Sequence, residues 1–383
     1  MTRTILFAGG GTAGHVYPAL AVAAAVAERE PDLEPVFVGT EGRLEGRLVP
    51  ASGYRFHHID ALPLPRRPSL GLFKLPAALR TAIRRCEEII TQERAVGAVT
   101  FGGYVSFPLD WACGRTDIPL VIHEQNSVPG IANQFAARWA DRIAVTFPGS
   151  AERFRQTERV SVTGNPVRAD MLNLDREQER AEALRHFRLH QRRRTVLVFG
   201  GSQGARSLNR AAVASYSHWA DPSRVQILHA AGRALYSEAA SAWERARAGG
   251  EGPLVRCVDY IDDMRAAYAA ADVVVCRAGA TSIAEISALG LPSVLVPYPH
   301  ATRDHQLVNA RSLAQIGAAR VIEDDELDGR RLAGAVQPLL DDQDERDALG
   351  RAARAFGRRD AADALARIVL DVVGKHQTSG VRT

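Results

Sequence analysis

The chain has 383 residues, of which 46% are hydrophobic, and its formal net charge is +4 at neutral pH. This length exceeds that of one typical core, so we expect two domains, and so small a charge excess does not by itself indicate a nucleic-acid partner. The cysteines are scattered without a CxxC pair, and no D-x-D follows an apolar strand, so we expect neither a zinc site nor a metal–diphosphate clamp. A strand begins almost at the first residue, and no apolar run approaches the ~20 residues of a spanning helix. We therefore expect no signal peptide and a location in the cytoplasm or on the cytoplasmic face of a membrane.

The first predicted strand, residues 4–8, runs directly into a glycine-rich turn over 9–14. A helix-forming stretch follows, so backbone N–H groups and a helix dipole would converge on a spot that suits a phosphate. The G-x-G-x-x-G spacing alone is weak evidence for a dinucleotide site, which also requires an acid at the end of the second strand. That strand, 35–38, is followed by Gly39-Thr40-Glu41, where the acid is displaced, so the fit to NAD is poor.

His15 stands where this first loop becomes helix. A helix N-terminus disfavours the cationic form of the ring, and a neutral imidazole beside a phosphate-sized pocket suits a general base. A capping or core histidine would explain the same position equally well, and the residues alone leave both interpretations open.

Residues 62–90 mix apolar and basic side chains, and prolines break the front of the segment into a loop. Apolar residues ringed by cations suit an anionic lipid surface. The alternative is a helix whose Leu75, Leu79 and Ile83 face the core while its arginines are solvated, and the residues alone slightly favour this alternative. The candidate membrane contacts are Arg66, Arg67, Leu72, Phe73 and Lys74.

Polar and glycine residues follow the next strands of the first half. The strand at 97–101 ends in Gly102-Gly103-Tyr104, and the buried strand at 119–122 ends in His123-Glu124-Gln125-Asn126. Ligands of parallel sheets bind beyond the carboxyl ends of the strands. So many hydrogen-bonding groups after so apolar a strand therefore indicate a site, which the glycine turn would also line.

A second strand–glycine loop–helix unit lies half the chain away, with the strand at 195–199 and the loop at 200–204. Strand-like runs at 142–145, 225–228, 272–276 and 293–296 alternate with Ala-rich helical runs. This alternation predicts an α/β fold of parallel sheets covered on both faces. Two phosphate-type loops suggest two Rossmann-like domains with a diphosphate-bearing ligand between them, and the turn-rich segment 163–168 is the predicted seam.

The last candidate loop, 277–285, follows the strand at 272–276. Ser282 and Glu285 have the spacing of a capping box, in which Glu285 bonds back to the backbone at a helix start. The alternative is that Glu285 accepts from ribose hydroxyls while loop N–H groups hold phosphate, and the spacing does not separate the two. Asp304-His305-Gln306 would face the same crevice.

Taken together, these motifs resemble the MurG family of peptidoglycan N-acetylglucosaminyltransferases. The blocks that carry the resemblance span most of the chain in the family's order: residues 10–15, 102–106, 123–126, 164–168, 200–205, 260–264 and 277–285. It implies a GT-B fold of two Rossmann-like parallel-sheet domains with an interdomain cleft. The first domain would be 1–163 plus a returning helix at about 356–377, and the second 164–355.

The resemblance also implies an activity and its partners. An inverting transferase would move N-acetylglucosamine from UDP-GlcNAc to the 4-hydroxyl of MurNAc in undecaprenyl-diphospho-MurNAc-pentapeptide, turning lipid I into lipid II. It would need no cofactor or metal and would work as a peripheral protein on the cytoplasmic face of the inner membrane. An anionic membrane surface would be its further partner, without nucleic acid.

Site roles carry over by position. His15 is the proposed base, with Glu124 as the second candidate. The acceptor would contact Gly102, Gly103, Tyr104 and His123. The donor contacts would be Thr12, Ala13, Gly14, Asn126, Arg168, Ser202, Ile261, Ala280, Thr281, Ser282, Ile283, Ala284, Glu285 and Gln306. Ala13, Thr281 and His305 depart from frequent family residues, but none of these departures removes a chemical role.

Three other functions fit part of the pattern. A UDP-GlcNAc 2-epimerase would share fold and donor but would need neither the basic apolar segment nor a lipid acceptor. An NAD-dependent oxidoreductase lacks the second-strand acid and does not explain the second glycine loop. A nucleic-acid binder would rest on the basic charge alone.

Overall fold

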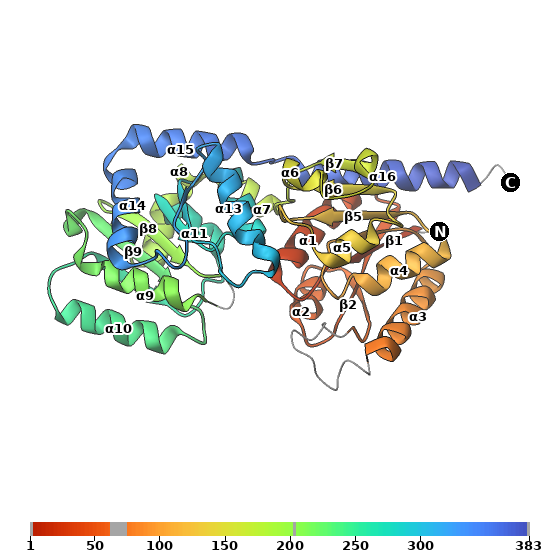
Figure 1. Ribbon diagram of the computed structural model, residues 1–383, viewed down its shortest axis with the longest axis horizontal. Coiled ribbons are helices and arrows are strands. Elements are labelled where there is room, and N and C mark those ends of the chain that lie inside the picture. The colour runs from red at the N-terminus through yellow and green to blue at the C-terminus, as the bar shows by residue number, and fades with distance from the viewer. Residues whose placement is uncertain (1–2, 62–74, 202–203, 381–383) are drawn as a thin grey trace. The chain divides into compact units, whose positions relative to one another are not determined.

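The computed structural model describes residues 3–61, 75–201 and 204–380 (Figure 1). The chain forms two compact units, Met1–Arg168 with Arg359–Thr383, and Ala169–Arg358. We call them the first and the second unit. The segment 164–168, which the sequence analysis assigned to the second domain, belongs to the first unit in this division.

The first unit is built on a seven-stranded sheet with the order β3-β2-β1-β4-β5-β6-β7, in which all neighbouring strands pair in parallel. Its strands are β1 (Arg3–Ala8), β2 (Leu33–Gly39), β3 (Arg55–His58), β4 (Ala95–Thr100), β5 (Leu120–Glu124), β6 (Arg142–Val145) and β7 (Val160–Val162). Its helices are α1 (Ala13–Arg29), α2 (Leu44–Ala51), α3 (Leu75–Glu93), α4 (Phe107–Thr116), α5 (Ile131–Ala136), α6 (Pro148–Ala151) and α16 (Ala361–Gly380), with a short 3-10 turn η2 (Thr157–Arg159).

Both faces of this sheet are buried, because successive residues of a strand point to opposite sides. In β1, Leu6 and Ala8 pack into the core under α3 to α5, whereas Ile5 and Phe7 pack into the core under α1 and α16. The last helix contributes Leu365, Val369 and neighbouring apolar residues to that second core. Figure 1 shows α16, drawn in blue, among the red and yellow elements of the first unit. The end of the chain is therefore part of the first core.

The second unit repeats the plan with a six-stranded parallel sheet, β10-β9-β8-β11-β12-β13. Its strands are β8 (Arg194–Phe199), β9 (Val225–Ala230), β10 (Leu254–Val258), β11 (Val273–Cys276), β12 (Ser293–Leu295) and β13 (Arg320–Val321). Its helices are α7 (Ala169–Leu172), α8 (Arg176–His186), α9 (Arg206–Ala214), α10 (Tyr236–Ala248), α11 (Met264–Ala270), α12 (Ala280–Leu289), α13 (His305–Gln315), α14 (Gly329–Asp341) and α15 (Gln343–Phe356). The 3-10 turns are η3 (Ser215–Ser217), η4 (Pro222–Arg224) and η5 (Thr302–Asp304).

Each sheet reverses its strand order at one place. In the first unit β1 lies between β2 and β4, and in the second unit β8 lies between β9 and β11. Loops that leave the carboxyl ends of strands on either side of such a point run in opposite directions and open a crevice, where ligands of α/β sheets bind. The predicted α/β class is thus confirmed, and the predicted glycine loops follow β1 and β8.

One buried histidine links β9 to α9 and α10 in the second unit. His229 of β9 is fully buried, and its Nδ1 accepts the indole N–H of Trp243 at 2.9 Å. Its Nε2 lies 3.0 Å from the side-chain oxygen of Asn209 on α9, to which it donates. Burial lowers the pKa of this ring from 6.5 to about 4. The network therefore exists with a neutral imidazole, since a proton on Nδ1 would face the indole donor.

We expect acid to destabilise the second unit through His229. In the unfolded chain the ring binds its proton near pH 6.5, but in the folded unit only near pH 4. The contribution of His229 to the free energy of unfolding is therefore fully present above pH 6.5. It is lost as the pH falls from 6.5 to about 4, by up to about 3 kcal/mol. Urea unfolding followed by tryptophan fluorescence across the window measures the loss. His229→Gln keeps an acceptor for Trp243 and a donor for Asn209, so it should flatten the pH dependence. An equally steep dependence in this variant would contradict the assignment.

Candidate functional site

Two glycine loops of the first unit meet at the point where the strand order reverses. They follow β1 and β4, and both need backbone conformations that favour glycine, with φ of +81° at Gly11 and +84° at Gly103. A Cβ on Gly103 would lie 3.1 Å from the carbonyl oxygen of Gly10 and 3.5 Å from the ring of His15. A Cβ on Gly11 would lie 3.1 Å from the ring of Tyr104. Residues from two predicted motifs thus form one cluster.

His15 lies in the first turn of α1, half-buried. Its Nδ1 is 3.0 Å from the carbonyl oxygen of Gly10 and 3.1 Å from the hydroxyl oxygen of Thr12. A carbonyl oxygen only accepts, so Nδ1 carries the proton and the lone pair of the neutral ring is on Nε2. Thr12 occupies the N-cap position. The ring is therefore neither the cap of α1 nor a fully buried core residue, and its tautomer is the one a base needs.

Glu45, in the first turn of α2, is hydrogen-bonded to this loop. It was not predicted as a site residue from the sequence. It is 1% exposed, and its carboxylate accepts the backbone N–H of Gly11 at 3.0 Å and the hydroxyl of Thr40 at 2.5 Å. In the sequence, the expected acid after β2 was Glu41. The acid that matters stands one helical turn later and folds back onto the loop.

The position of Glu45 also bears on the NAD hypothesis. A Cβ on Gly10 would lie 2.6 Å from a Glu45 carboxylate oxygen, so the carboxylate is packed directly against the loop. In a dinucleotide site the loop amides face the pyrophosphate and the acid faces the ribose. Here one loop amide is already bonded to a carboxylate, whose negative charge opposes a diphosphate at this loop. The geometry speaks against a dinucleotide site in the first unit.

Glu124, the second candidate base, has a structural role. It is 2% exposed and accepts the backbone N–H of Asn126 at 2.9 Å, the backbone N–H of Gly130 at 3.0 Å and the side-chain amide of Asn133 at 2.8 Å. Burial raises the pKa of Glu124 above its ordinary value even though these N–H groups favour its charged form. The carboxylate therefore organises the loop between β5 and α5.

His123, predicted to touch the acceptor, is bonded inside the first unit. Its ring is fully buried, and its Nε2 lies 3.0 Å from the carbonyl oxygen of Gly164. Burial lowers its pKa to about 4. Gln125 in the same polar run also bonds within the unit, since its side chain donates to the carbonyl of Phe101 at 2.8 Å. Such internal bonding is not visible in a sequence pattern.

The predicted donor contacts of the first unit lie near the start of α1 or after β5. Ala13 and Gly14 form the first turn of α1. The guanidinium of Arg168 stacks over the ring of Tyr17 on the same helix, 4.5 Å from its centre. Asn126 is half-buried and donates to Glu124. Arg168 is thus brought to the helix that also carries His15, although the two residues lie 153 positions apart in the chain.

In the second unit, α12 begins directly after the loop that follows β11. Its N-cap is Gly279, which has no side chain that could cap the first-turn N–H groups. A Cβ on Gly279 would meet nothing within 4 Å. Thr281, in the first turn, has a buried hydroxyl that finds no hydrogen-bond partner among the described residues. This helix start offers donors to an anion.

The capping-box interpretation of Ser282 and Glu285 is wrong. Both residues lie inside α12, because the helix starts at Ala280. Glu285 is 9% exposed, and one of its carboxylate oxygens accepts the hydroxyl of the buried Tyr268 at 2.9 Å. Tyr268 belongs to α11, so this bond connects two helices that frame the carboxyl end of the sheet. Ile283 and Ala284, two further predicted donor contacts, are buried in the same turn.

Arg277, in the loop after β11, was given no role from the sequence. It is 8% exposed and donates to Asp324 at 2.6 Å, to the hydroxyl of Ser207 at 2.7 Å and to the carbonyl of Pro297 at 3.0 Å. These partners come from the first turn of α9 and from the segments that follow β12 and β13. One buried guanidinium therefore fixes the loops at the carboxyl edge of the second sheet, which needs the planar donors of an arginine.

The remaining predicted contacts are placed as follows. Ile261 is buried, at 5% exposure, and Gln306 of α13 accepts the backbone N–H of Tyr298 at 3.0 Å. Ser202 and the membrane candidates Arg66, Arg67, Leu72, Phe73 and Lys74 lie outside the described residues. No described helix has the length and apolar character to cross a membrane. Within residues 3–61, 75–201 and 204–380, no group of histidine, cysteine and acidic side chains is arranged to hold a metal ion.

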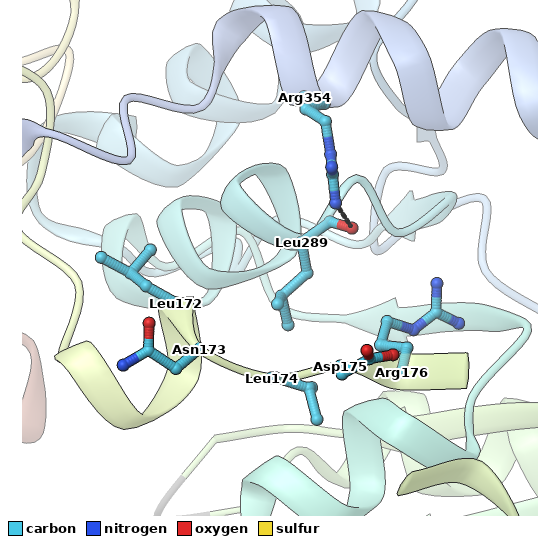
Figure 2. A pocket seen from close by; sticks show the side chains of 7 residues that line it. All are labelled: Leu172, Asn173, Leu174, Asp175, Arg176, Leu289 and Arg354. Atoms are coloured by element: carbon cyan, nitrogen blue, oxygen red, sulfur yellow. Dashed lines mark hydrogen bonds between the residues drawn. The ribbon is translucent and has the colours of Figure 1, made fainter. Parts of the chain in front are cut away.

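A pocket of the second unit lies away from these loops (Figure 2). It has a volume of about 360 Å³ and is lined by Leu172, Asn173, Leu174, Asp175, Arg176, Leu289 and Arg354. Its charged groups have internal partners: Arg354 donates to the carbonyl of Leu289 at 3.0 Å, and Asp175 caps α8. Arg176 donates to the carbonyl of Tyr268 at 3.2 Å. The pocket contains none of the candidate residues.

Two family models match the chain, each in one unit. The model of the glycosyltransferase family 28 N-terminal domain matches residues 5–145, and that of the family's C-terminal domain matches residues 195–365. A relative from Nocardioides sp. strain JS614 is 44% identical over 96% of this chain and 98% of its own length. It carries the name UDP-N-acetylglucosamine–N-acetylmuramyl-(pentapeptide) pyrophosphoryl-undecaprenol N-acetylglucosamine transferase.

Solved structures agree on the fold. The MurG crystal structure from Acinetobacter baumannii superposes with a TM-score of 0.75 at 26% identity, covering 96% of this chain and 99% of that one. A putative UDP-N-acetylglucosamine 2-epimerase from Listeria monocytogenes reaches a TM-score of 0.70 at 13% identity, covering 98% and 97%. The second likeness shows the fold alone, so it gives no support to the epimerase alternative.

Proposed function

The chain belongs to glycosyltransferase family 28, among the peptidoglycan N-acetylglucosaminyltransferases of the MurG type, and on this premise we propose its reaction. It transfers N-acetylglucosamine from UDP-N-acetylglucosamine to the N-acetylmuramyl-(pentapeptide) pyrophosphoryl-undecaprenol acceptor, forming lipid II from lipid I. The proposal has the enzyme act with inversion at the 4-hydroxyl of the muramyl sugar.

One observation carries the catalytic part of the proposal. The Nδ1 of His15 is bonded to the carbonyl of Gly10, so the basic lone pair is on Nε2, in a half-buried ring at the carboxyl edge of the first sheet. In the proposed step, the acceptor oxygen forms a bond to the anomeric carbon as the bond from that carbon to the diphosphate oxygen breaks. The hydroxyl proton passes to Nε2, and UDP leaves with the electron pair. Such a base contributes roughly 10²–10⁴-fold to the rate.

We propose that the donor's diphosphate binds at the start of α12. The first-turn N–H groups and the Thr281 hydroxyl supply neutral donors, and the helix dipole favours the charge that develops as UDP leaves. Glu285 in the next turn is the proposed ribose contact. Because the acceptor displaces UDP in one step, without a covalent intermediate, the configuration at the anomeric carbon inverts. Positioning and electrostatics supply the catalysis.

We further propose that the protein works at the cytoplasmic face of the membrane. The proposed acceptor carries an undecaprenyl chain, which is stable only in a bilayer, whereas no described helix is fit to cross one. The enzyme must therefore meet the lipid at the surface. Residues 66, 67 and 72–74 remain the candidates for that contact because the sequence places basic and apolar side chains close together there.

The reaction is tested by mixing the protein with UDP-N-acetylglucosamine and a soluble short-chain analogue of the lipid-linked acceptor. We expect UDP release only when both are present, together with a disaccharide product. UDP release without acceptor, or conversion of the donor to its 2-epimer, would favour the epimerase and contradict the proposed transfer.

Replacement of His15 tests the base. His15→Ala should lower kcat by roughly 10²–10⁴-fold and change the affinity for UDP-N-acetylglucosamine far less, because the ring acts on the acceptor proton. Steady-state kinetics and a calorimetric donor titration give the two numbers. A variant that keeps most of its turnover would show that the proton leaves by another route.

Replacement of Glu285 tests the donor site. Glu285→Ala should weaken UDP binding by about 10- to 100-fold, the size expected for hydrogen bonds to a charged group. Tyr268→Phe is the matched control, since it removes the bond between Tyr268 and Glu285 but keeps the carboxylate. Equal losses in the two variants would assign Glu285 a helix-packing role, and unchanged UDP affinity in Glu285→Ala would exclude it from the site.

A further inference from the structure

The Gly10–Gly11 peptide group connects His15 to a buried carboxylate. Its carbonyl oxygen accepts the Nδ1–H of His15 at 3.0 Å, and its N–H donates to Oε2 of Glu45 at 3.0 Å. The other oxygen of Glu45 accepts the hydroxyl of Thr40 at 2.5 Å. A continuous chain of hydrogen bonds therefore runs from the imidazole through one peptide to the carboxylate.

Tight packing fixes this arrangement. Glu45 is 1% exposed. A Cβ on Gly10 would lie 2.6 Å from Oε1 of Glu45, and a Cβ on Gly39 would lie 2.9 Å from its Cγ. The carboxylate fits only because both positions are glycine. It is therefore held in one place against the peptide, and the peptide is held in the orientation that presents its carbonyl to His15.

The two possible tautomers of His15 are not equivalent here. With the proton on Nε2, the lone pair of Nδ1 would face the Gly10 carbonyl oxygen at 3.0 Å, which is repulsive. A carboxylate that accepts from the N–H end of a peptide polarises it and strengthens its carbonyl as an acceptor. A buried negative charge also favours a nearby cation, because the local dielectric constant is low. Both effects favour Nδ1–H, and they favour it most when the ring is protonated.

We propose that Glu45 is a positioning residue that acts on His15 through the Gly10–Gly11 peptide, holding the ring with its proton on Nδ1 and stabilising the imidazolium formed as the acceptor proton is taken. It corresponds in role to the acid of a Ser-His-Asp triad, with a peptide group between acid and imidazole. The inference rests on the proposed role of His15 as the base.

Three other residues described near the ring, His123, Thr12 and Tyr104, do not supply this effect. His123 of β5 interacts electrostatically with His15, but burial lowers the pKa of His123 to about 4, so it stays neutral at the working pH. Thr12 contributes a neutral hydroxyl, and Tyr104 packs its ring against Gly11. Of the titratable groups described around the ring of His15, Glu45 is the anion, and it is bonded to the peptide that accepts the Nδ1–H of His15.

The test variant is Glu45→Gln, which keeps the size of the side chain and an acceptor for the Gly11 N–H but removes the charge. We expect kcat to fall about tenfold, the size typical of losing an outer partner of a functional histidine, with both KM values unchanged. The base must be unprotonated to act, and the carboxylate favours its protonated form. The acid limb of the pH–rate profile should therefore move to lower pH, by on the order of one unit.

Two further variants separate this role from simple loop support. Thr40→Val removes the other bond to Glu45 but leaves the charge, so it should lower thermal stability without moving the acid limb. The double variant His15→Ala/Glu45→Gln should be no slower than His15→Ala alone, since Glu45 acts only through the ring. An unmoved acid limb in Glu45→Gln, or additive losses in the double variant, would overturn the proposal.

A measurement on the parent protein covers the case in which Glu45→Gln does not fold. Nuclear magnetic resonance of isotope-labelled ring nitrogens, with His15 assigned by its absence in His15→Ala, should show Nδ1 protonated and Nε2 unprotonated at neutral pH. The opposite tautomer overturns the proposal. Failure of the proposed function is recognised separately, because then the parent itself gives no acceptor-dependent UDP release.

Discussion

The parallel pairing of β1 with both β2 and β4 is the constraint on which the first unit's site depends. It places the carboxyl ends of β1 and β4 side by side, so the loops that follow them are forced together. Ser106, after β4, donates to the carbonyl of Ala8 at the end of β1 at 3.0 Å and thereby ties the two loops. His15 and Gly103 meet only because of this pairing. The second sheet uses the same arrangement at β8 and β11, where α12 begins.

Buried carboxylates stabilise the loops at this sheet edge. Glu45 and Glu124 are both almost fully buried, and both accept backbone N–H groups of irregular segments. A loop at a strand end cannot use sheet hydrogen bonds, and its buried N–H groups need acceptors. A carboxylate supplies two oxygens at once. In the second unit the guanidinium of Arg277 does the converse task, donating to acceptors from several loops. The rigid edge that results is what a positioned base or donor site requires.

The loop after β1 and the loop before α12 thus have different roles, although both join a strand to a helix. In the first unit a loop amide is bonded to Glu45, and the loop orients an imidazole. In the second unit the N-cap of α12 is Gly279, which has no side chain, and the amides of this helix start are suited to an anion. A glycine loop after a strand is therefore not sufficient to identify a phosphate site. A loop can bind phosphate only if its amide N–H groups are not already bonded to a side chain of the protein. Whether they are depends on residues distant in the sequence.

The sequence by itself determined the α/β class, the central strands and the family, because buried parallel strands are continuous apolar runs and the motifs are local. The strands it did not single out, β3, β7, β10 and β13, are the edge strands of the two sheets. They are short and partly exposed, so their residues lack an apolar run. It also located His15 and the start of α12, since loop residues at strand ends follow from chain order. The tertiary structure alone decided that Glu45 supports the His15 loop, that Glu124 and His123 are internal, and that Glu285 bonds to Tyr268 and does not cap a helix. Each of these facts depends on which side chains meet across elements, and pairwise contact between separate elements leaves no local pattern in the chain.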